Sequence, residues 1–488
     1  MRRKRKSGND PYVLSKKLLS TNKVGKSATK PNIYTRTNTG FVVEEGFLDS
    51  LYQPHTLTAL ICFLVGVVYV PSQITAHPLQ SGIVAGSSLF ICYGAVQFRD
   101  GILMRPHPMV WRIVHAIGIL YIVCLAFLLY QPVGDIRSTI IPMFAGTPGN
   151  FNLSKSYGGD CVMFRNGTMN TILKDTIFDL FVIAHGLGYF VHALLARNWV
   201  MLWVTSVMFE VLEASLQHVV PNFQECWWDH LLLDIWGFNL AGMVVGMWLV
   251  SKLAAGLFDW GGEPYRKLPS RRKKFKRIVW QLFPHKFERY QWSIFVDFRR
   301  FAIVMAVVFG QLLLILNAFL LKHIFWVPSS NPINSIRMAL ISAIGIPASQ
   351  EAYEFSKPDR EHLRLGQNAW ILVLLLLLET VLIGKNIPPE MLQLPSSYIT
   401  FCWCSSSLLF SCWIVFQYYV LPTHIYAWLR NQSVARARKL SQHCDRFSMC
   451  ILFLSIVPLL YILARDCYRT YAFADNPAVL APIGQGEW

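Results

Sequence analysis

The sequence predicts an all-α membrane protein with ten or eleven membrane-spanning helices. Of its 488 residues, 53% are hydrophobic and only 15% are charged, whereas soluble proteins carry about 25% charged residues. The mean hydropathy is +0.37, and apolar stretches of the length that crosses a bilayer, about 20 residues, recur along the chain. We predict helices because the alternation typical of membrane β-barrels does not occur and lipid offers no partners to unpaired backbone groups.

The predicted spans divide the chain into three regions. A polar, basic leader covers 1–50, a multi-span membrane region covers 51–427, and a C-terminal region at 428–488 adds one more hydrophobic stretch. The spans are predicted at 56–73, 81–98, 110–130, 176–196, 199–220, 231–256, 300–326, 333–349, 369–385, 398–421 and 449–465.

Basic residues predict the orientation of these spans, because the cytoplasmic segments of membrane proteins are enriched in Lys and Arg. The leader and the loops at 97–112, 263–294 and 422–447 are all basic. Alternation from a cytosolic N-terminus places all four in the cytosol. We therefore attribute the net charge of +17 to topology and to contact with anionic lipids, and not to nucleic-acid binding.

The same alternation places the loop at 131–175 on the lumenal side. Asn152 and Asn166 in this loop begin glycosylation sequons, which fits that placement. The 11 Cys include no CxxC pair and lie mostly in apolar runs. We therefore expect them to be small buried side chains and not disulfide partners or zinc ligands.

Ionisable residues are concentrated in the window 179–239. Charged groups are costly inside a bilayer, so they indicate functional positions. Glu210 and Glu213 share one helix face because they are three residues apart, and Asp234 lies near the start of the next span, which runs back. The three carboxylates should thus meet in the lumenal half of the membrane, within reach of His185. The window contains Asp179, His185, His192, Glu210, Glu213, His218, Glu225, Asp229, His230 and Asp234.

Such a cluster predicts a particular chemistry. Several carboxylates in a poor solvent need a cation or protons, and an oxygen-rich ligand set suits calcium, magnesium or manganese better than zinc. A histidine beside them can accept a proton from an attacking hydroxyl, and a metal can neutralise phosphate oxygens. The pattern favours an enzyme that acts on a phosphorylated lipid. The alternatives are a transporter with an intramembrane ion path and a structural polar network.

The same residues resemble the signature of the base-exchange phosphatidylserine synthases. The resemblance is carried by Phe209–Glu213 and by Pro221–Asp229, which reads PNFQECWWD, followed by Asp234 and Asn239. It implies a multi-pass enzyme of the endoplasmic reticulum in which L-serine replaces the head group of an existing phospholipid with the help of Ca²⁺. The sequence contains neither a P-loop nor the aspartate motif of the CDP-alcohol phosphotransferases, which agrees with an exchange that needs no nucleotide.

The resemblance also implies a role for each candidate residue. His185 would activate the serine hydroxyl in a direct displacement, or would act in a transfer that passes through a phosphatidyl-enzyme. The implied Ca²⁺ ligands are Glu210, Glu213 and Asp234. The implied substrate-binding residues are Asn222, Glu225, Asp229 and Asn239. On the cytosolic side, Arg105 and His107 would belong to a regulatory region that senses the product, with anchoring of lipid phosphates as the alternative.

Two branches of this family differ in the lipid that donates the phosphatidyl group. Tyr157–Cys161, Val207–Glu210 and Trp228–His230 are more similar to the branch that uses phosphatidylethanolamine. The predicted reaction therefore exchanges ethanolamine for serine, with phosphatidylcholine as the alternative donor. A homo-oligomer is compatible with the sequence.

Overall fold

The computed structural model describes most of the chain, in two compact units, Met1–Ala85 and Gly86–Trp488. In the first unit, strand β1 (Tyr34–Thr37) pairs antiparallel with β2 (Gly40–Val43). The predicted span at 56–73 lies outside the described residues. Those residues are 34–37, 40–43, 78–99, 108–142, 160–165, 168–177, 180–254, 270–275, 289–328, 331–357, 365–392, 394–425 and 434–474.

The structure confirms an all-α polytopic membrane protein. In the described part, 8 helices are long and apolar enough to cross a membrane, and each overlaps a predicted span. They include the C-terminal hydrophobic stretch. The helices at the predicted spans 81–98 and 333–349 are present but do not belong to these 8. The spanning helices cover Met109–Leu128, Leu173–Ala196, Trp199–Leu216, Asp229–Lys252, Phe298–Ile324, Gln367–Asn386, Ser397–His424 and Arg446–Ala472.

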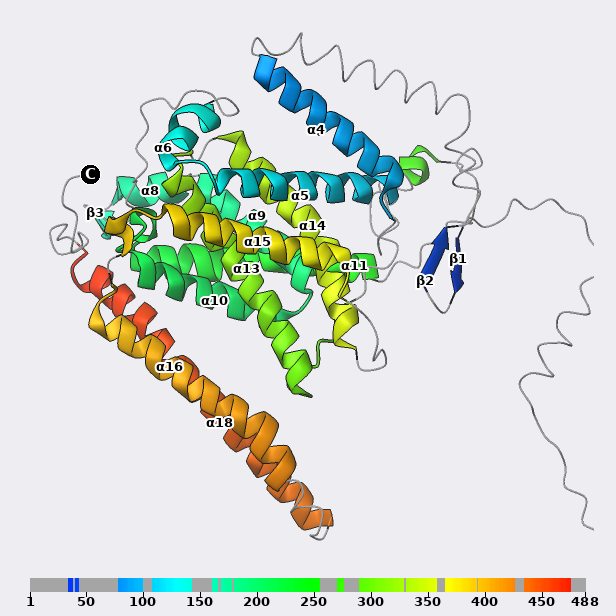
Figure 1. Ribbon diagram of the computed structural model, residues 1–488. Helices are drawn as coiled ribbons and strands as arrows, with labels where there is room; N and C mark the ends of the chain where they lie inside the picture. Colours follow the sequence, from blue (N-terminus) through cyan, green and yellow to red (C-terminus); the bar gives the residue numbers. More distant parts are fainter. Residues whose placement is uncertain are drawn as a thin grey trace, which may run out of the picture. The chain divides into compact units, whose positions relative to one another are not determined.

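Figure 1 shows the order of the elements along the chain. The long helices are α4 (Pro78–Gln97), α5 (Pro108–Leu128), α9 (Leu180–Ala196), α10 (Trp199–Leu216), α11 (Leu240–Ala254), α13 (Phe298–Ile324), α14 (Pro332–Ser356), α15 (Gln367–Asn386), α16 (Ser397–Val415) and α18 (Val434–Ala472). Within the described ranges, three π-helical segments accompany them, η1 (Ile136–Ile140), η3 (Asp229–Asn239) and η6 (Phe416–Ile425). The short elements are α6 (Val133–Asp135), strands β3 (Phe164–Arg165) and β4 (Thr168–Met169), α8 (Thr171–Ile177), and the 3₁₀ turns η2 (Pro221–Phe223) and η5 (Pro389–Leu392).

A buried polar network crosses the core formed by α5, α13, α14 and α15. Glu379, which is fully buried, accepts hydrogen bonds from Tyr121 at 2.7 Å and from Asn317 at 3.2 Å. Arg337 completes the network, with its Nε and Nη2 atoms 2.7 and 2.5 Å from the two carboxylate oxygens. Glu379, a membrane-helix carboxylate outside the 179–239 window, is therefore paired within the helix bundle.

Helices α9 and α11 cross in direct backbone contact. A Cβ atom added to Gly242 would overlap the carbonyl oxygen of Gly186, and one added to Gly246 would lie 2.9 Å from the carbonyl oxygen of Phe190. Only glycine permits this approach. The crossing brings His185, the residue before Gly186, close to the π-helical segment that precedes α11.

We expect Gly242→Ala to destabilise the protein, because the added methyl group must push two helix backbones apart. The cost should be about 1–3 kcal/mol, which is typical of overpacking. Thermal unfolding of the detergent-solubilised protein measures it. Gly188→Ala is the matched control on α9, since no described atom lies within 4 Å of a Cβ at Gly188. Equal unfolding midpoints for both variants would contradict the expected contact.

The π-helical segment η3 has its own repeat of buried side chains. Its buried residues are Asp229, His230, Asp234, Ile235 and Asn239, which recur every five positions. In an α-helix, residues five apart point about 140° away from each other. Hydrogen bonds from residue i to i+5 reduce that divergence. The segment therefore presents Asp229, Asp234 and Asn239 to the protein interior together.

Helices α16 and α18 lie side by side as a hairpin, drawn in yellow-orange to red in Figure 1. Trp413 of α16 donates a hydrogen bond to Ser448 of α18 at 3.0 Å, and Ser406 donates one to the carbonyl oxygen of Ser455 at 2.6 Å. The C-terminal part of α18 also packs against α10. The C-terminal helix thereby reaches the end of α10 at which the carboxylates lie.

Candidate active site

The carboxylates of the window gather where α10 ends and η3 begins. Glu210 and Glu213 on α10 are 0% and 1% exposed, and Asp229 and Asp234 on η3 are 4% and 3% exposed. Glu225, in the connection between the two helices, is largely buried as well. Five acidic side chains thus share one water-poor region.

The imidazole of His230 lies among these carboxylates. Its Nδ1 atom is 2.8 Å from Oε2 of Glu210 and 3.5 Å from Oε2 of Glu225. On the other side of Glu210, the amide of Asn239 lies 3.4 Å from Oε1 and also donates to the Ser206 hydroxyl at 3.2 Å. Glu210 is therefore held from both sides by η3.

The second histidine of the site is His185 on α9. Its Nδ1 atom lies 3.2 Å from Oδ1 of Asp234. Its side chain keeps 14% of its surface exposed, whereas that of His230 is fully buried. Of these two histidines, His185 is thus the one that an incoming substrate can reach, and Asp234 is placed to orient its ring.

Potential metal ligands fall into two groups that meet at Glu225. One ligand atom from each of Glu210, Glu213, Glu225 and His230 lies within 4.8 Å of the others. The same holds for Glu225, Asp229 and Asp234. The three residues that the family resemblance implies as ligands are therefore divided between two adjacent groups, with Glu225 belonging to both.

Unpartnered oxygens show that the region fits a cation. Among the described residues, Oε2 of Glu213, Oε2 of Glu225, Oδ1 of Asn222 and Oδ1 of Asn239 are buried without a hydrogen-bond partner. Buried polar atoms are nearly always satisfied, and a missing ion is one explanation for exceptions. Ca²⁺ takes six to eight oxygen ligands, so this donor set suits it.

Electrostatics around Glu225 lead to the same conclusion. Burial, followed by the nearby carboxylates of Glu213 and Asp229, raises the pKa of Glu225 well above its usual range. An ionised Glu225 is therefore unfavourable unless positive charge is supplied. A bound divalent cation would supply that charge.

A disulfide between Cys161 and Cys226 fixes the connection that carries Glu225. The indole of Trp228 donates to the carbonyl oxygen of Cys161 at 3.2 Å, and the backbone N–H of Cys161 donates to Ala474 at 2.9 Å. The expectation of no disulfides was wrong for this pair. The two cysteines are 65 positions apart in sequence and lie in polar connections, so spacing alone gave no signal. Trp228 is fully buried.

Removing this disulfide should weaken both stability and activity, because it ties Cys226, the residue that follows Glu225, to Cys161. We expect Cys226→Ser to lower the free energy of unfolding by about 2–4 kcal/mol. Thermal unfolding with and without dithiothreitol measures the effect. Cys404, a free and exposed cysteine of the described part, provides the control Cys404→Ser. A reductant effect of equal size on wild type and Cys226→Ser would contradict the prediction.

Other predicted positions are distributed as follows. Asn222 is 6% exposed at the start of the same connection, and His192 is buried against Tyr189, with ring centroids 5.5 Å apart. Arg105 and His107 lie outside the described residues. The sequence predicted no role for His230, although this residue lies in the 179–239 window. Asp466 of α18 was not predicted at all, because it lies more than 200 positions after that window.

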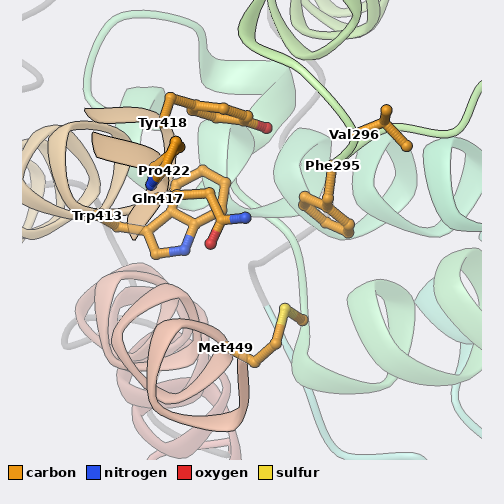
Figure 2. A pocket seen from close by; sticks show the side chains of 7 residues that line it. All are labelled: Phe295, Val296, Trp413, Gln417, Tyr418, Pro422 and Met449. Carbon is orange, nitrogen blue, oxygen red and sulfur yellow. The ribbon is translucent and has the colours of Figure 1, made fainter. Parts of the chain in front are cut away.

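A cavity of about 380 Å³ lies elsewhere, between the start of α13, the π-helical η6 and α18. Figure 2 shows Phe295, Trp413 and Tyr418 around it. None of its lining residues belongs to the carboxylate cluster. It therefore contributes nothing to the chemistry of that cluster.

Comparison with known proteins places these residues in a family. The model of the phosphatidyl serine synthase family matches residues 106–387, which include every described acidic residue of the cluster on α10 and η3. The chain belongs to the phosphatidylserine synthase family. Its members transfer a phosphatidyl group to serine, so this chain is a phosphatidylserine-forming transferase with serine and a membrane phospholipid as substrates.

Relatives of two kinds are found within the family. Phosphatidylserine synthase 2 of Homo sapiens is 33% identical over 80% of this chain and 82% of its own length, and that of Danio rerio is 32% identical over 78% and 85%. CDP-diacylglycerol–serine O-phosphatidyltransferase 3 of Oryza sativa is 38% identical over 62% of this chain and 74% of its own length. The name of the Oryza sativa relative gives CDP-diacylglycerol as the lipid donor, whereas the name phosphatidylserine synthase 2 gives no donor.

Proposed function

We propose that this phosphatidylserine synthase works by calcium-dependent base exchange, in which L-serine replaces the ethanolamine of phosphatidylethanolamine. One observation carries the proposal. A set of buried, unpartnered carboxylate and amide oxygens lies beside a histidine that is still accessible, within the part of the chain that matches the family. This arrangement provides both a cation site and a base.

His185 is the proposed general base. Its ring, oriented by Asp234 at 3.2 Å, accepts the proton of the serine hydroxyl. The serine oxygen forms a bond to phosphorus, and the bond from phosphorus to the ethanolamine oxygen breaks. The imidazolium then returns its proton to the departing ethanolamine oxygen. One phosphodiester replaces another, so neither ATP nor CTP is required.

The residues that would hold calcium are the carboxylates of the two ligand groups. Glu210, Glu213 and Glu225 offer oxygens in one group, and Asp229 and Asp234 join Glu225 in the other. When bound, calcium supplies positive charge that neutralises phosphate oxygens and developing negative charge. Asn222 and Asn239 each have a buried oxygen free to contact the ion or the serine.

The proposed location is the endoplasmic reticulum membrane, with a cytosolic N-terminus and the site in the lumenal half. Support comes from the basic loops of the sequence and from the disulfide next to Glu225, since disulfides persist in oxidising compartments. Arg105 and His107 then lie on the cytosolic side, where product sensing remains a prediction.

A reaction with labelled serine tests the function. Purified protein is supplied with phosphatidylethanolamine, phosphatidylcholine or CDP-diacylglycerol, each with calcium or with a chelator. We expect labelled phosphatidylserine from phosphatidylethanolamine, one ethanolamine released per product, and no product with the chelator. Product mainly from phosphatidylcholine would reverse the donor assignment. Product from CDP-diacylglycerol alone would overturn base exchange.

A further inference from the structure

The C-terminal helix α18 contributes a carboxylate to the site, although it lies beyond the residues 106–387 that match the family. This carboxylate belongs to Asp466, which is only 3% exposed. A buried carboxylate in a membrane helix is costly unless it is paired. Its partners therefore show what it does.

Asp466 connects three helical elements. Its Oδ1 atom accepts a hydrogen bond from Gln217 at the end of α10, at 3.0 Å, and lies 3.4 Å from the guanidinium of Arg469 on its own helix. Arg469 also donates to Gln217 at 3.0 Å. The second oxygen, Oδ2, points toward η3 and lies 3.8 Å from Nε2 of His230.

The ring of His230 is fully buried between two carboxylates. Nδ1 lies 2.8 Å from Glu210, while Nε2 has no hydrogen-bond partner among the described residues and has Asp466 as its charged neighbour. At 3.8 Å the Asp466 carboxylate acts on the ring through its charge or through one bridging water, in the place that the hydrogen-bonded outer partners of metal-ligating histidines take. The contacts from Asp466 to His230 and from His230 to Glu210 thus connect α18 with the proposed cation site.

We propose that Asp466 is a positioning residue, which holds the His230 ring so that this ring in turn directs the Glu210 carboxylate toward the metal ligands. The inference rests on the proposed calcium dependence. It makes α18 a part of the active site. The competing explanation is a latch, in which Asp466 only ties α18 to α10 through Gln217.

Asp466→Asn separates these two explanations. The Asn oxygen can still accept the hydrogen bond from Gln217, so a latch would survive. The group that faces His230 loses its charge, so the positioning would fail. Thr470→Val is the matched control, because the Thr470 hydroxyl is equally buried on α18 and bonds only to backbone carbonyls of that helix among the described residues.

Equilibrium binding of ⁴⁵Ca to the purified full-length protein, without lipid or serine, is the primary measurement. We expect the calcium dissociation constant of Asp466→Asn to rise about 10-fold, the lower end of the range for outer-shell partners, with Thr470→Val unchanged. The calcium concentration for half-maximal activity should rise in parallel. Wild-type affinity in Asp466→Asn would overturn the inference, and so would an equal loss in both variants.

Two further results keep the interpretation clear. The double variant His230→Gln/Asp466→Asn should have nearly the same calcium dissociation constant as His230→Gln alone if Asp466 acts through His230. If the two substitutions act independently, their effects on this constant will multiply, which would contradict the proposal. If wild type binds calcium but exchanges no head group, the proposed function fails, and the calcium shift of Asp466→Asn still decides this inference. If wild type binds no calcium, the proposed function and this inference are both wrong.

Discussion

Glu213→Gln is expected to abolish calcium-dependent phosphatidylserine formation, with a loss of at least about 100-fold. The variant keeps the shape of the side chain but removes the charge of a buried oxygen that has no hydrogen-bond partner among the described residues. Loss of an outer-shell partner already costs 10–100-fold at metal sites, and a direct ligand should cost more. Initial rates across a calcium titration measure the effect.

The matched control for this variant is Glu351→Gln. Glu351 is also buried, at 4% exposure, but it accepts hydrogen bonds from Asn368 at 2.7 Å and from the backbone of Ala369 at 2.8 Å, at the start of α15. We expect this control to lower thermal stability and to keep wild-type calcium dependence. Normal activity in Glu213→Gln would refute a calcium role for this residue. Inactivity of both variants would indicate a general loss of structure.

His185→Asn is expected to lower kcat by about 10²–10⁴-fold, the range that general-base catalysis contributes. Calcium binding should persist, because His185 belongs to neither group of potential ligands. This combination distinguishes a base from a ligand. Rates at saturating calcium, with ⁴⁵Ca binding on the same preparations, provide both readouts.

His192→Asn is the control on the same helix. Its imidazole is 3% exposed and packs on Tyr189, so the substitution should reduce stability and leave the catalytic rate of the folded protein intact. If His185→Asn lost calcium binding together with activity, His185 would be a ligand or a structural residue. If it kept full activity, another group would have to take the serine proton.

Hydropathy was sufficient to predict the helical membrane fold, because the cost of burying unpaired backbone in lipid leaves few alternatives. It also placed the carboxylates of α10 and η3 in one region. The directions in which the individual side chains of the site point were harder to predict from the sequence. Reasoning from α-helical spacing related Glu210 to Glu213 correctly. It could not reveal that a π-helix turns Asp229, Asp234 and Asn239 inward together, since that geometry depends on packing against α9 and α10.

Contacts between segments that are distant in sequence also could not be predicted. Gln217 and Asp466 are separated by 249 positions, and the partner of Cys226 lies in a lumen-assigned loop that shows no cysteine motif. Nothing in local composition distinguishes Asp466 from any other acidic residue near a helix end. Only the folded arrangement shows that it lies behind His230.

The disulfide region also has a consequence for biosynthesis. Cys161 is bonded to Cys226, accepts from the indole of Trp228 and donates to the carbonyl of Ala474, which follows α18. The segment that carries Glu225 is thus held by a residue made before it, Cys161, which in turn contacts a residue made after α18, Ala474. A ribosome-bound intermediate that lacks α18 can form the disulfide, but it lacks the contact of Cys161 with Ala474 and that of Gln217 with Asp466. We expect a nascent chain to acquire its full activity only after α18 has been synthesised, so that shorter nascent chains leave the lipids of their own membrane unchanged.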